Sequence, residues 1–219
     1  MVMLCRSEER ANTAIKWITD NMLGDGNGSL LFEQCDLSLM ESVRKCSGRL
    51  LNSLDKIDIL INNAGILWDR GRTVTEDGFE LTFATNHLGH FLLTDLVLPL
   101  LKKSAESGFT PRIVNVSSEA HRWRKGVLWD DLNMEKMDYD HGQAYTQSKV
   151  ANILHAMELA NRLKDSGILA FSVHPGLYFK HDRMLASNNV PFLQDSWKQR
   201  SLRSQVVEIW EWGALARFS

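Results

Sequence analysis

The chain has 219 residues, of which 44% are hydrophobic and 24% are charged, and its formal net charge is -2. This length suits a single α/β domain with a sizeable core and is short for two domains. The small net charge, without long runs of one sign, argues against a nucleic-acid-binding surface and favours a small neutral or anionic ligand. Three cysteines without paired metal spacing indicate a reducing compartment and no disulfides.

The N-terminal part of the chain alternates between strand and helix patterns. Residues 1–4 have the pattern of a strand end, and apolar residues at helical spacing follow over 8–23. A second strand is predicted over 29–37. Ser38 and Glu41 then have the spacing of a capping box, which predicts the start of the next helix.

Three later apolar runs, at 57–62, 112–116 and 168–173, have the composition of strands that are buried on both faces. Helical patterns separate them, over about 78–103 and 143–165. Strands that alternate with helices predict a Rossmann-like, doubly wound parallel sheet. The ligand site of such a sheet lies at the carboxyl ends of its strands.

Small and polar residues follow the predicted strands at this edge. They are Asp36 after the second strand, Asn62–Gly65 after the third, Ser117 and Ser118 after the fourth, and His174–Gly176 after the fifth. Amide side chains and glycine allow hydrogen bonding and close backbone approach to a flat polar ligand. Each segment taken alone is also compatible with a turn or a helix cap.

Tyr145 and Lys149 lie four positions apart within the predicted helix over 143–165, so their side chains share one face of it. A phenol has an ordinary pKa of about 10, and a cation within about 4–6 Å favours its ionised form. With a hydroxyl of Ser117 or Ser118 to hold a substrate carbonyl, Tyr145 could give or take a proton during hydride transfer. The same spacing is common on solvent-exposed helices, so it does not decide the function by itself.

Five motifs stand in this order in the chain: "NNAG" at 62–65, "NHLGHF" at 86–91, "RIVNVSS" at 112–118, "AYTQSK" at 144–149 and "VHPG" at 173–176. In this combination they resemble the short-chain dehydrogenase/reductase family. The segments around them are similar to the retinol dehydrogenase and WW-domain oxidoreductase branch of that family. The resemblance predicts a truncated Rossmann-like dinucleotide-binding and catalytic domain over 1–176 and a divergent C-terminal tail over 177–219.

The resemblance implies a role for each matching catalytic position. Tyr145 would be the proton donor or acceptor, and Lys149 would lower its pKa and bind the nicotinamide ribose. Ser118 would orient the substrate carbonyl, and Asn86 would sustain the proton relay. His87 and His90, at i, i+3 spacing, could serve a metal, but no third ligand or acidic partner is evident, so ordinary packing is the preferred interpretation and no metal is expected.

The resemblance also implies a set of cofactor-binding residues: Asp36 and Leu37 for the adenine, Asn63, Ala64 and Gly65 near the adenine ribose, and Lys149, Pro175 and Gly176 at the nicotinamide end. Arg6 stands where a guanidinium would pair with a 2′-phosphate. We therefore expect NADP(H) in preference to NAD(H), since an acidic residue would instead bind a free ribose hydroxyl.

Two departures from the family pattern shape these expectations. The family's first strand and glycine-rich pyrophosphate turn are not found, and the glycines at 24–28 follow a helix and precede a strand, the reverse of a phosphate loop. Roughly 30 residues of that unit are expected to be absent. Because that strand is central in the doubly wound order, the strands holding Leu4 and Ile59 would each lose a partner.

The second departure follows Gly176, where the family's cofactor-contacting threonine has no counterpart. The segment over 196–219 has an apolar spacing that predicts a helix through Leu202, Val206, Ile209 and Trp210.

Two functions remain open from the sequence. The first is an NADP-dependent oxidoreductase that interconverts an alcohol and a carbonyl on a retinoid-like or other lipophilic substrate, with Tyr145 as general acid and base. The second is a truncated, catalytically impaired form that acts only by protein binding or not at all. We expect no nucleic-acid partner and no transmembrane segment, and we leave a homo-oligomer open. The cytosol is the default location, with membrane association reserved for a longer form.

Overall fold

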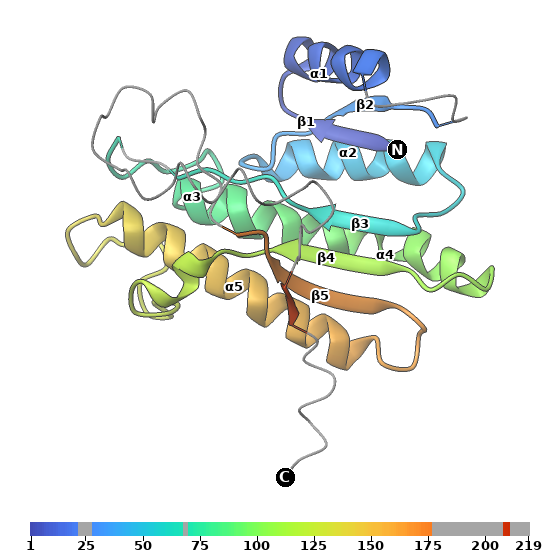
Figure 1. The fold of residues 1–219 in the computed structure, drawn as a ribbon. Coiled ribbons are helices and arrows are strands. Elements are labelled where there is room, and N and C mark those ends of the chain that lie inside the picture. Colours follow the sequence, from blue (N-terminus) through green and yellow to red (C-terminus); the bar gives the residue numbers. More distant parts are fainter. Residues whose placement is uncertain (22–27, 68–69, 177–207, 211–219) are drawn as a thin grey trace, which may run out of the picture.

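The computed structural model describes residues 1–21, 28–67, 70–176 and 208–210 (Figure 1). Its elements in chain order are β1 (Val2–Cys5), α1 (Glu8–Asn21), β2 (Leu31–Gln34), α2 (Met40–Ser53), β3 (Ile59–Asn62), α3 (Leu81–Phe83), a π-helical turn (Ala84–Leu88), α4 (Gly89–Glu106), β4 (Arg112–Val116), a 3-10 helix (Glu119–Arg122), α5 (His141–Arg162), β5 (Leu169–His174) and β6 (Glu208–Trp210). The predicted alternation of strands and helices is confirmed through β5.

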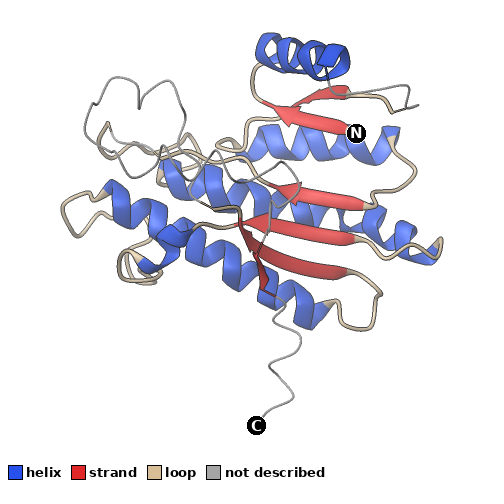
Figure 2. Ribbon diagram, viewed as in Figure 1, coloured by secondary structure: helices blue, strands red, loops and turns tan. Residues whose placement is uncertain are grey.

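The described strands form two separate sheets (Figures 1 and 2). β1 and β2 pair in parallel, and a second sheet has the order β3-β4-β5-β6. β3, β4 and β5 are parallel, whereas β6 is antiparallel to β5. This is the arrangement of a partial Rossmann-like sheet. As expected, β1 and β3 do not pair with each other, and no described strand pairs with both of them.

In Figure 1, α4 and α5 lie behind the strands β3, β4 and β5, α2 lies between β3 and the β1–β2 pair, and no described helix lies in front of β3, β4 and β5. Leu60 and Asn62 of β3 are buried, and the Asn62 side chain contacts Thr94 on α4. Ile59 and Ile61 point the other way and are 50% and 60% exposed. The prediction that this strand is buried on both faces is therefore wrong for the described residues.

The core lies between α2, α4 and the sheet. Its fully buried members are Val43, Cys46, Val97, Leu100, Leu101 and Ile113. Removal of such side chains from water is the main driving force for packing the helices on the strands. In the described part of the chain, no helix combines the length and the apolar character that a membrane span requires.

The start of α2 differs from the predicted capping box. Its N-cap is Leu39, which makes no side-chain cap, and the Ser38 hydroxyl instead donates to Asp36 Oδ1 at 2.6 Å. The backbone N–H of Met40 donates to Asp77 Oδ2 at 2.9 Å. A carboxylate from a distant loop thus replaces the local cap, which sequence spacing could not reveal.

The helix predicted for the C-terminal segment is wrong at the two of its apolar positions that the structure describes. Ile209 and Trp210, predicted to be helical, lie in β6 beside β5. The rest of the predicted tail helix, and the glycine-rich loop except for its last residue, fall outside the described residues. The helix predicted over 78–103 runs from Leu81 to Glu106 and contains the π-helical turn at Ala84–Leu88.

Gly89 and Gly48 provide a matched test of the packing of α4. A Cβ at Gly89 would lie 2.3 Å from the Leu37 carbonyl oxygen, whereas a Cβ at Gly48 has nothing within 4 Å. We expect Gly89→Ala to destabilise the chain by about 1–3 kcal/mol through overpacking. Gly48→Ala should stabilise it by about 0.5–1 kcal/mol, because alanine is the better helix former. Urea unfolding measures both, and effects of the same sign would contradict this packing.

Candidate active site

Helix α5 carries both Tyr145 and Lys149, and its first turn is firmly capped. The Asp140 carboxylate accepts hydrogen bonds from the backbone N–H groups of Gly142 at 2.7 Å and Gln143 at 3.1 Å. Such a cap satisfies donors that a helix start leaves without partners. It fixes the start of the helix and thereby the direction in which Tyr145 and Lys149 point.

Lys149 is almost fully buried, with 4% of its surface exposed. Its Nζ donates to the Val116 carbonyl at 3.0 Å, at the end of β4, and lies 5.4 Å from the centroid of the Tyr145 ring. Burial lowers the pKa of Lys149 to about 8, because the ammonium loses hydration. The side chain is still mainly protonated at neutral pH, so it directs a positive charge at the phenol ring.

Ser118 and Tyr145 face each other at the end of β4. Ser118 caps the 3-10 helix, since its hydroxyl accepts from the Ala120 N–H at 3.2 Å. Burial raises the pKa of Tyr145, and a hydrogen bond with the Ser118 side chain opposes that rise. The phenol is therefore protonated at neutral pH. The neighbouring Ser117 is buried, and its hydroxyl donates to the Lys149 carbonyl at 2.8 Å, which leaves Ser118 to meet Tyr145.

Asn86 lies in the π-helical turn and is fully buried. Its side chain binds the backbone of Ile66 twice, accepting from the N–H at 2.7 Å and donating to the carbonyl at 2.9 Å. It also donates to the Ser148 hydroxyl at 3.1 Å. A Cβ at Gly65 would lie 3.3 Å from Asn86 Oδ1 and 3.5 Å from Lys149 Nζ. The loop after β3 therefore passes directly beside the lysine, and a side chain at position 65 would crowd Asn86.

Four buried asparagines, Asn62, Asn86, Asn115 and Asn152, connect the elements beneath these residues, and we call them the asparagine network. Asn62 Nδ2 donates to Asn115 Oδ1 at 2.8 Å, and Asn115 Nδ2 donates to the Asn152 carbonyl at 3.2 Å. Asn152 Nδ2 in turn donates to the Asn86 carbonyl at 3.1 Å. Because buried polar groups are costly when unpaired, these hydrogen bonds between asparagines fix β3, β4, α5 and the π-helical turn relative to one another.

Three histidines lie beside the asparagine network. His87 Nδ1 contacts Asn152 Oδ1 and His90 Nδ1 contacts the Asn86 carbonyl, both at 3.0 Å. Burial lowers the pKa of His90 and of His155 to about 4. The spacing of His87 and His90 is thus used for hydrogen bonds. The described residues contain no group of three side chains suited to hold a metal ion.

The residues expected at the adenine end lie on the other sheet. Arg6 after β1 and Asp36 after β2 line a polar cavity of about 460 Å³. Asp36 Oδ1 accepts from the Ser38 N–H at 2.9 Å, and Leu37 packs against Gly89. Asn63, Ala64, Pro175 and Gly176 are exposed at the carboxyl ends of β3 and β5. The structure brings Ser118, Tyr145, Lys149, Asn86 and Gly65 together and leaves Arg6 and Asp36 as a second group.

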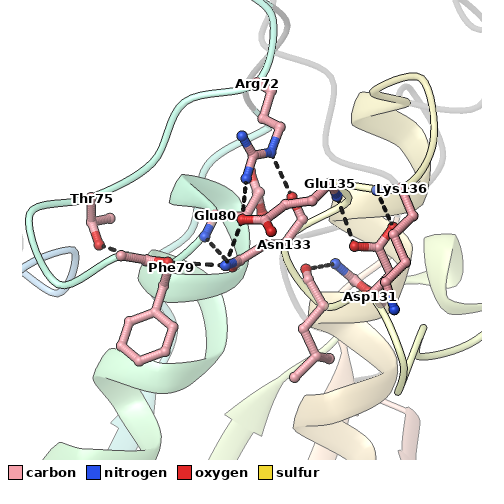
Figure 3. A network of polar contacts seen from close by, with 11 residues as sticks. Arg72, Thr75, Phe79, Glu80, Asp131, Asn133, Glu135 and Lys136 are labelled. Atoms are coloured by element: carbon pink, nitrogen blue, oxygen red, sulfur yellow. Dashed lines mark hydrogen bonds and ion pairs between the residues drawn. The ribbon is translucent and has the colours of Figure 1, made fainter.

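A second polar network ties the start of α3 to the chain before α5, and Figure 3 shows the part of it around Glu80 and Asn133. The fully buried Glu80 carboxylate accepts from the Thr82 N–H at 2.8 Å, the Phe83 N–H at 2.7 Å and the Tyr139 hydroxyl at 2.9 Å. Asn133 Oδ1 accepts from the Glu80 N–H at 2.9 Å. Sequence spacing did not indicate this network, because its members come from two loops far apart in the chain.

Glu80→Gln tests this network. An amide can accept at only one of its two outer atoms, so the variant leaves at least one buried N–H or O–H without an acceptor and should cost about 1–3 kcal/mol of unfolding free energy. Glu135→Gln is the matched control, since the Glu135 side chain is 62% exposed and its ion pair with Arg72 should contribute under about 1 kcal/mol. Urea unfolding that ranks Glu135→Gln as the costlier change would contradict this assignment.

Lys149→Met tests the cost of burying the ammonium. The folded-state pKa of about 8 lies below the ordinary 10.5, so the unfolded chain binds more protons between these pH values and the stability should rise with pH there. We expect the variant to be more stable than the parent by roughly 1–3 kcal/mol at pH 7. This difference in unfolding free energy should become smaller as the pH rises through 8 towards 10.

Lys45→Met provides the control for the pH series, because the Lys45 side chain is 66% exposed. Its stability should follow that of the parent chain at every pH. A constant difference between Lys149→Met and the parent from pH 7 to pH 10 would show that Lys149 is not held with a lowered pKa.

Comparison with known proteins gives matches to one family. The family model for short chain dehydrogenases matches residues 1–128. Human retinol dehydrogenase 13 is 41% identical over 177 residues, which cover 81% of this chain and 51% of that protein. Human retinol dehydrogenase 11 is 44% identical over 174 residues, covering 80% and 52%. The chain spans about half the length of the curated relatives it matches.

Solved structures share the fold. An uncharacterised protein from Mycobacterium paratuberculosis aligns with a TM-score of 0.66 at 36% identity, covering 82% of this chain and 59% of that one. Pseudomonas aeruginosa RhlG in its complex with NADP aligns with a TM-score of 0.64 at 24% identity, covering 87% and 67%, and shows the fold alone. On the family match and the identity to its relatives, the chain belongs to the short-chain dehydrogenase family, in the branch related to retinol dehydrogenases.

Proposed function

We propose that this oxidoreductase interconverts a carbonyl and an alcohol on a lipophilic substrate with NADP(H) as cofactor. The observation that carries the proposal is the grouping of Ser118, Tyr145 and Lys149 at the carboxyl end of β4. A hydroxyl, a phenol and an ammonium at one place are the groups that a carbonyl needs when it accepts a hydride and a proton.

The residues near Lys149 fit the nicotinamide end of such a cofactor. Gly65 leaves free the space that a Cβ would fill beside Asn86 and the Lys149 ammonium. Lys149 Nζ donates a hydrogen bond to the Val116 carbonyl, and since an ammonium has three donors it can also bind ribose hydroxyls. The cofactor, when bound, supplies the hydride. Its pyrophosphate has no glycine-rich turn to receive it among the described residues.

The proton chemistry follows from the environment of Tyr145. Burial raises the pKa of its phenol, so Tyr145 holds a proton at neutral pH and can give it to a substrate oxygen. The Ser118 side chain, which faces Tyr145, can hold that oxygen in place. The Lys149 charge, 5.4 Å from the ring centroid, favours the phenolate that remains, although burial raises the pKa of Tyr145 where the resemblance implied a lowered one. This protonation state favours carbonyl reduction.

The preference for NADP(H) rests on Arg6. Its exposed side chain lines the cavity beside Asp36, where it can meet a 2′-phosphate. A metagenomic short-chain oxidoreductase and RhlG, both similar in fold, are described as complexes with NADP. The expected adenine contacts of Asp36 and Leu37 remain part of the proposal.

A lipophilic substrate is supported by side chains beside the site and by the relatives. Leu67 and Trp123 are 53% and 50% exposed. Leu67 follows the Ile66 backbone that Asn86 binds, and Trp123 ends the 3-10 helix that Ser118 caps. Two of the relatives above are named retinol dehydrogenases, which makes a retinoid-like alcohol or aldehyde the first substrate class to test.

The alternative function, binding another protein without turnover, is favoured by one specific observation. β1 and β3 lie in separate sheets, and Ile59 and Ile61 are exposed on the uncovered face of β3. Unpaired strand edges and exposed apolar side chains are features of interaction surfaces. Cofactor binding separates the two functions, because only the first requires it.

Tyr145→Phe and Tyr139→Phe form the decisive pair of variants, since each removes one phenolic hydroxyl. We expect the chain to bind NADPH, seen as tryptophan quenching, and to reduce a retinoid-like aldehyde. Tyr145→Phe should lower turnover about a hundredfold or more while it spares NADPH binding, because the general acid is lost. Tyr139→Phe should retain turnover at temperatures where it is folded.

Two results decide against the proposal in different ways. Turnover by Tyr145→Phe equal to that of the parent would refute the assignment of the proton donor. Absence of NADPH binding by the folded chain would favour the alternative function.

A further inference from the structure

Asn152 lies on α5, three positions after Lys149, and is 2% exposed. Its Nδ2 donates to two backbone carbonyls, Asn86 at 3.1 Å and Val116 at 3.2 Å. Its Oδ1 lies 3.0 Å from His87 Nδ1. Carbonyl oxygens only accept, so the amide nitrogen must face them and the amide oxygen must face the histidine. His87 Nδ1 therefore carries the proton, and every polar atom of the Asn152 side chain has a partner.

The two carbonyls that Asn152 binds belong to the π-helical turn and to the end of β4, whose relative position determines the geometry of the site. The Asn86 carbonyl lies in the π-helical turn and accepts from the side chains of both His90 and Asn152. A π-helical turn is an irregular, widened segment that is often found at functional sites. The side chain of the same Asn86 binds Ile66 in the loop after β3.

The Val116 carbonyl is shared. It accepts from Asn152 Nδ2 and from Lys149 Nζ, which lies at 3.0 Å. The Asn152 amide thus contacts the π-helical turn, from which Asn86 binds the loop after β3. It also contacts the end of β4, where the Val116 carbonyl accepts from Lys149.

We propose that Asn152 is a positioning residue, which sets the Asn86 side chain and the loop after β3 relative to Lys149 by holding the Asn86 and Val116 carbonyls together. The effect of Asn152 on turnover rests on the proposed function, whereas its effect on the position of the loop after β3 does not. Asn152 touches none of the reacting groups, so it acts through Asn86 and Val116.

Hydrogen exchange of the Ile66 amide tests the proposal on the full chain without cofactor. This N–H is bonded to Asn86 Oδ1 at 2.7 Å and reports whether Asn86 keeps its place. Asn152→Leu has a similar volume but no donor, and it should speed the exchange of the Ile66 amide roughly tenfold or more relative to the amides of β4. Asn161→Leu, at an exposed position of the same helix, should leave that ratio unchanged.

Asn152→Asp provides a second variant of nearly the same shape. Its carboxylate cannot donate to either carbonyl, so it should release the Ile66 amide in the same way. Equal acceleration of all amides, or unchanged exchange at Ile66 in either folded variant, would overturn the positioning role. Failure of both variants to fold would overturn it too, because Asn152 would then serve folding itself.

Turnover provides the second readout. With NADPH and an aldehyde, Asn152→Leu should lower the turnover number about tenfold, because a small misplacement of reacting groups is costly, and Asn161→Leu should not. A parent chain without NADPH-dependent turnover would contradict the proposed function alone, and the exchange at Ile66 would still decide the role of Asn152. Full turnover by Asn152→Leu would show that the site does not depend on it.

Discussion

The ammonium of Lys149 is buried against a neutral partner, the Val116 carbonyl, and the site depends on this contact. A buried charge is costly when no opposite charge accompanies it, and the lowered pKa of Lys149 reflects that cost. A carboxylate in this place would stabilise the fold and would also cancel the charge that reaches Tyr145. The asparagine network is neutral, so it fixes the geometry of the site without cancelling the charge of Lys149. The site is therefore positioned by hydrogen bonds and charged by a single lysine.

The position of Arg6 and Asp36 relative to Lys149 depends on the packing of helices and not on hydrogen bonds within the site. The residues proposed for proton transfer lie on α5 and just after β4, beside the sheet of β3, β4 and β5, whereas Arg6 and Asp36 follow the strands of the β1–β2 sheet. Strand pairing does not connect these sheets in the described part of the chain. Helix α2 packs against α4, and the close approach of Gly89 to Leu37 joins the two halves. The distance between the two groups of residues proposed to bind the cofactor is thus set by helix packing.

Sequence patterns predicted the features that depend on local spacing. Tyr145 and Lys149 share one face of a helix, and the strand at 112–116 is observed with the same bounds. Features that depend on distant partners were not predicted. Asn152 bonds to a carbonyl 66 positions away, and Asp77 replaces the expected cap of α2. Burial of Ile61 was predicted from composition, but composition cannot tell whether an element covers a strand.

The pH at which Tyr145 ionises is the most direct test of the account. It can be measured as the ultraviolet absorbance difference between the chain and its Tyr145→Phe variant, with and without NADP+. Burial predicts ionisation above the ordinary value of 10.0 for the chain alone. A cationic nicotinamide beside the phenol should then lower the pKa by about one unit or more, because a nearby positive charge favours the phenolate. Ionisation near neutral pH in the chain alone, or no shift with saturating NADP+, would contradict the account.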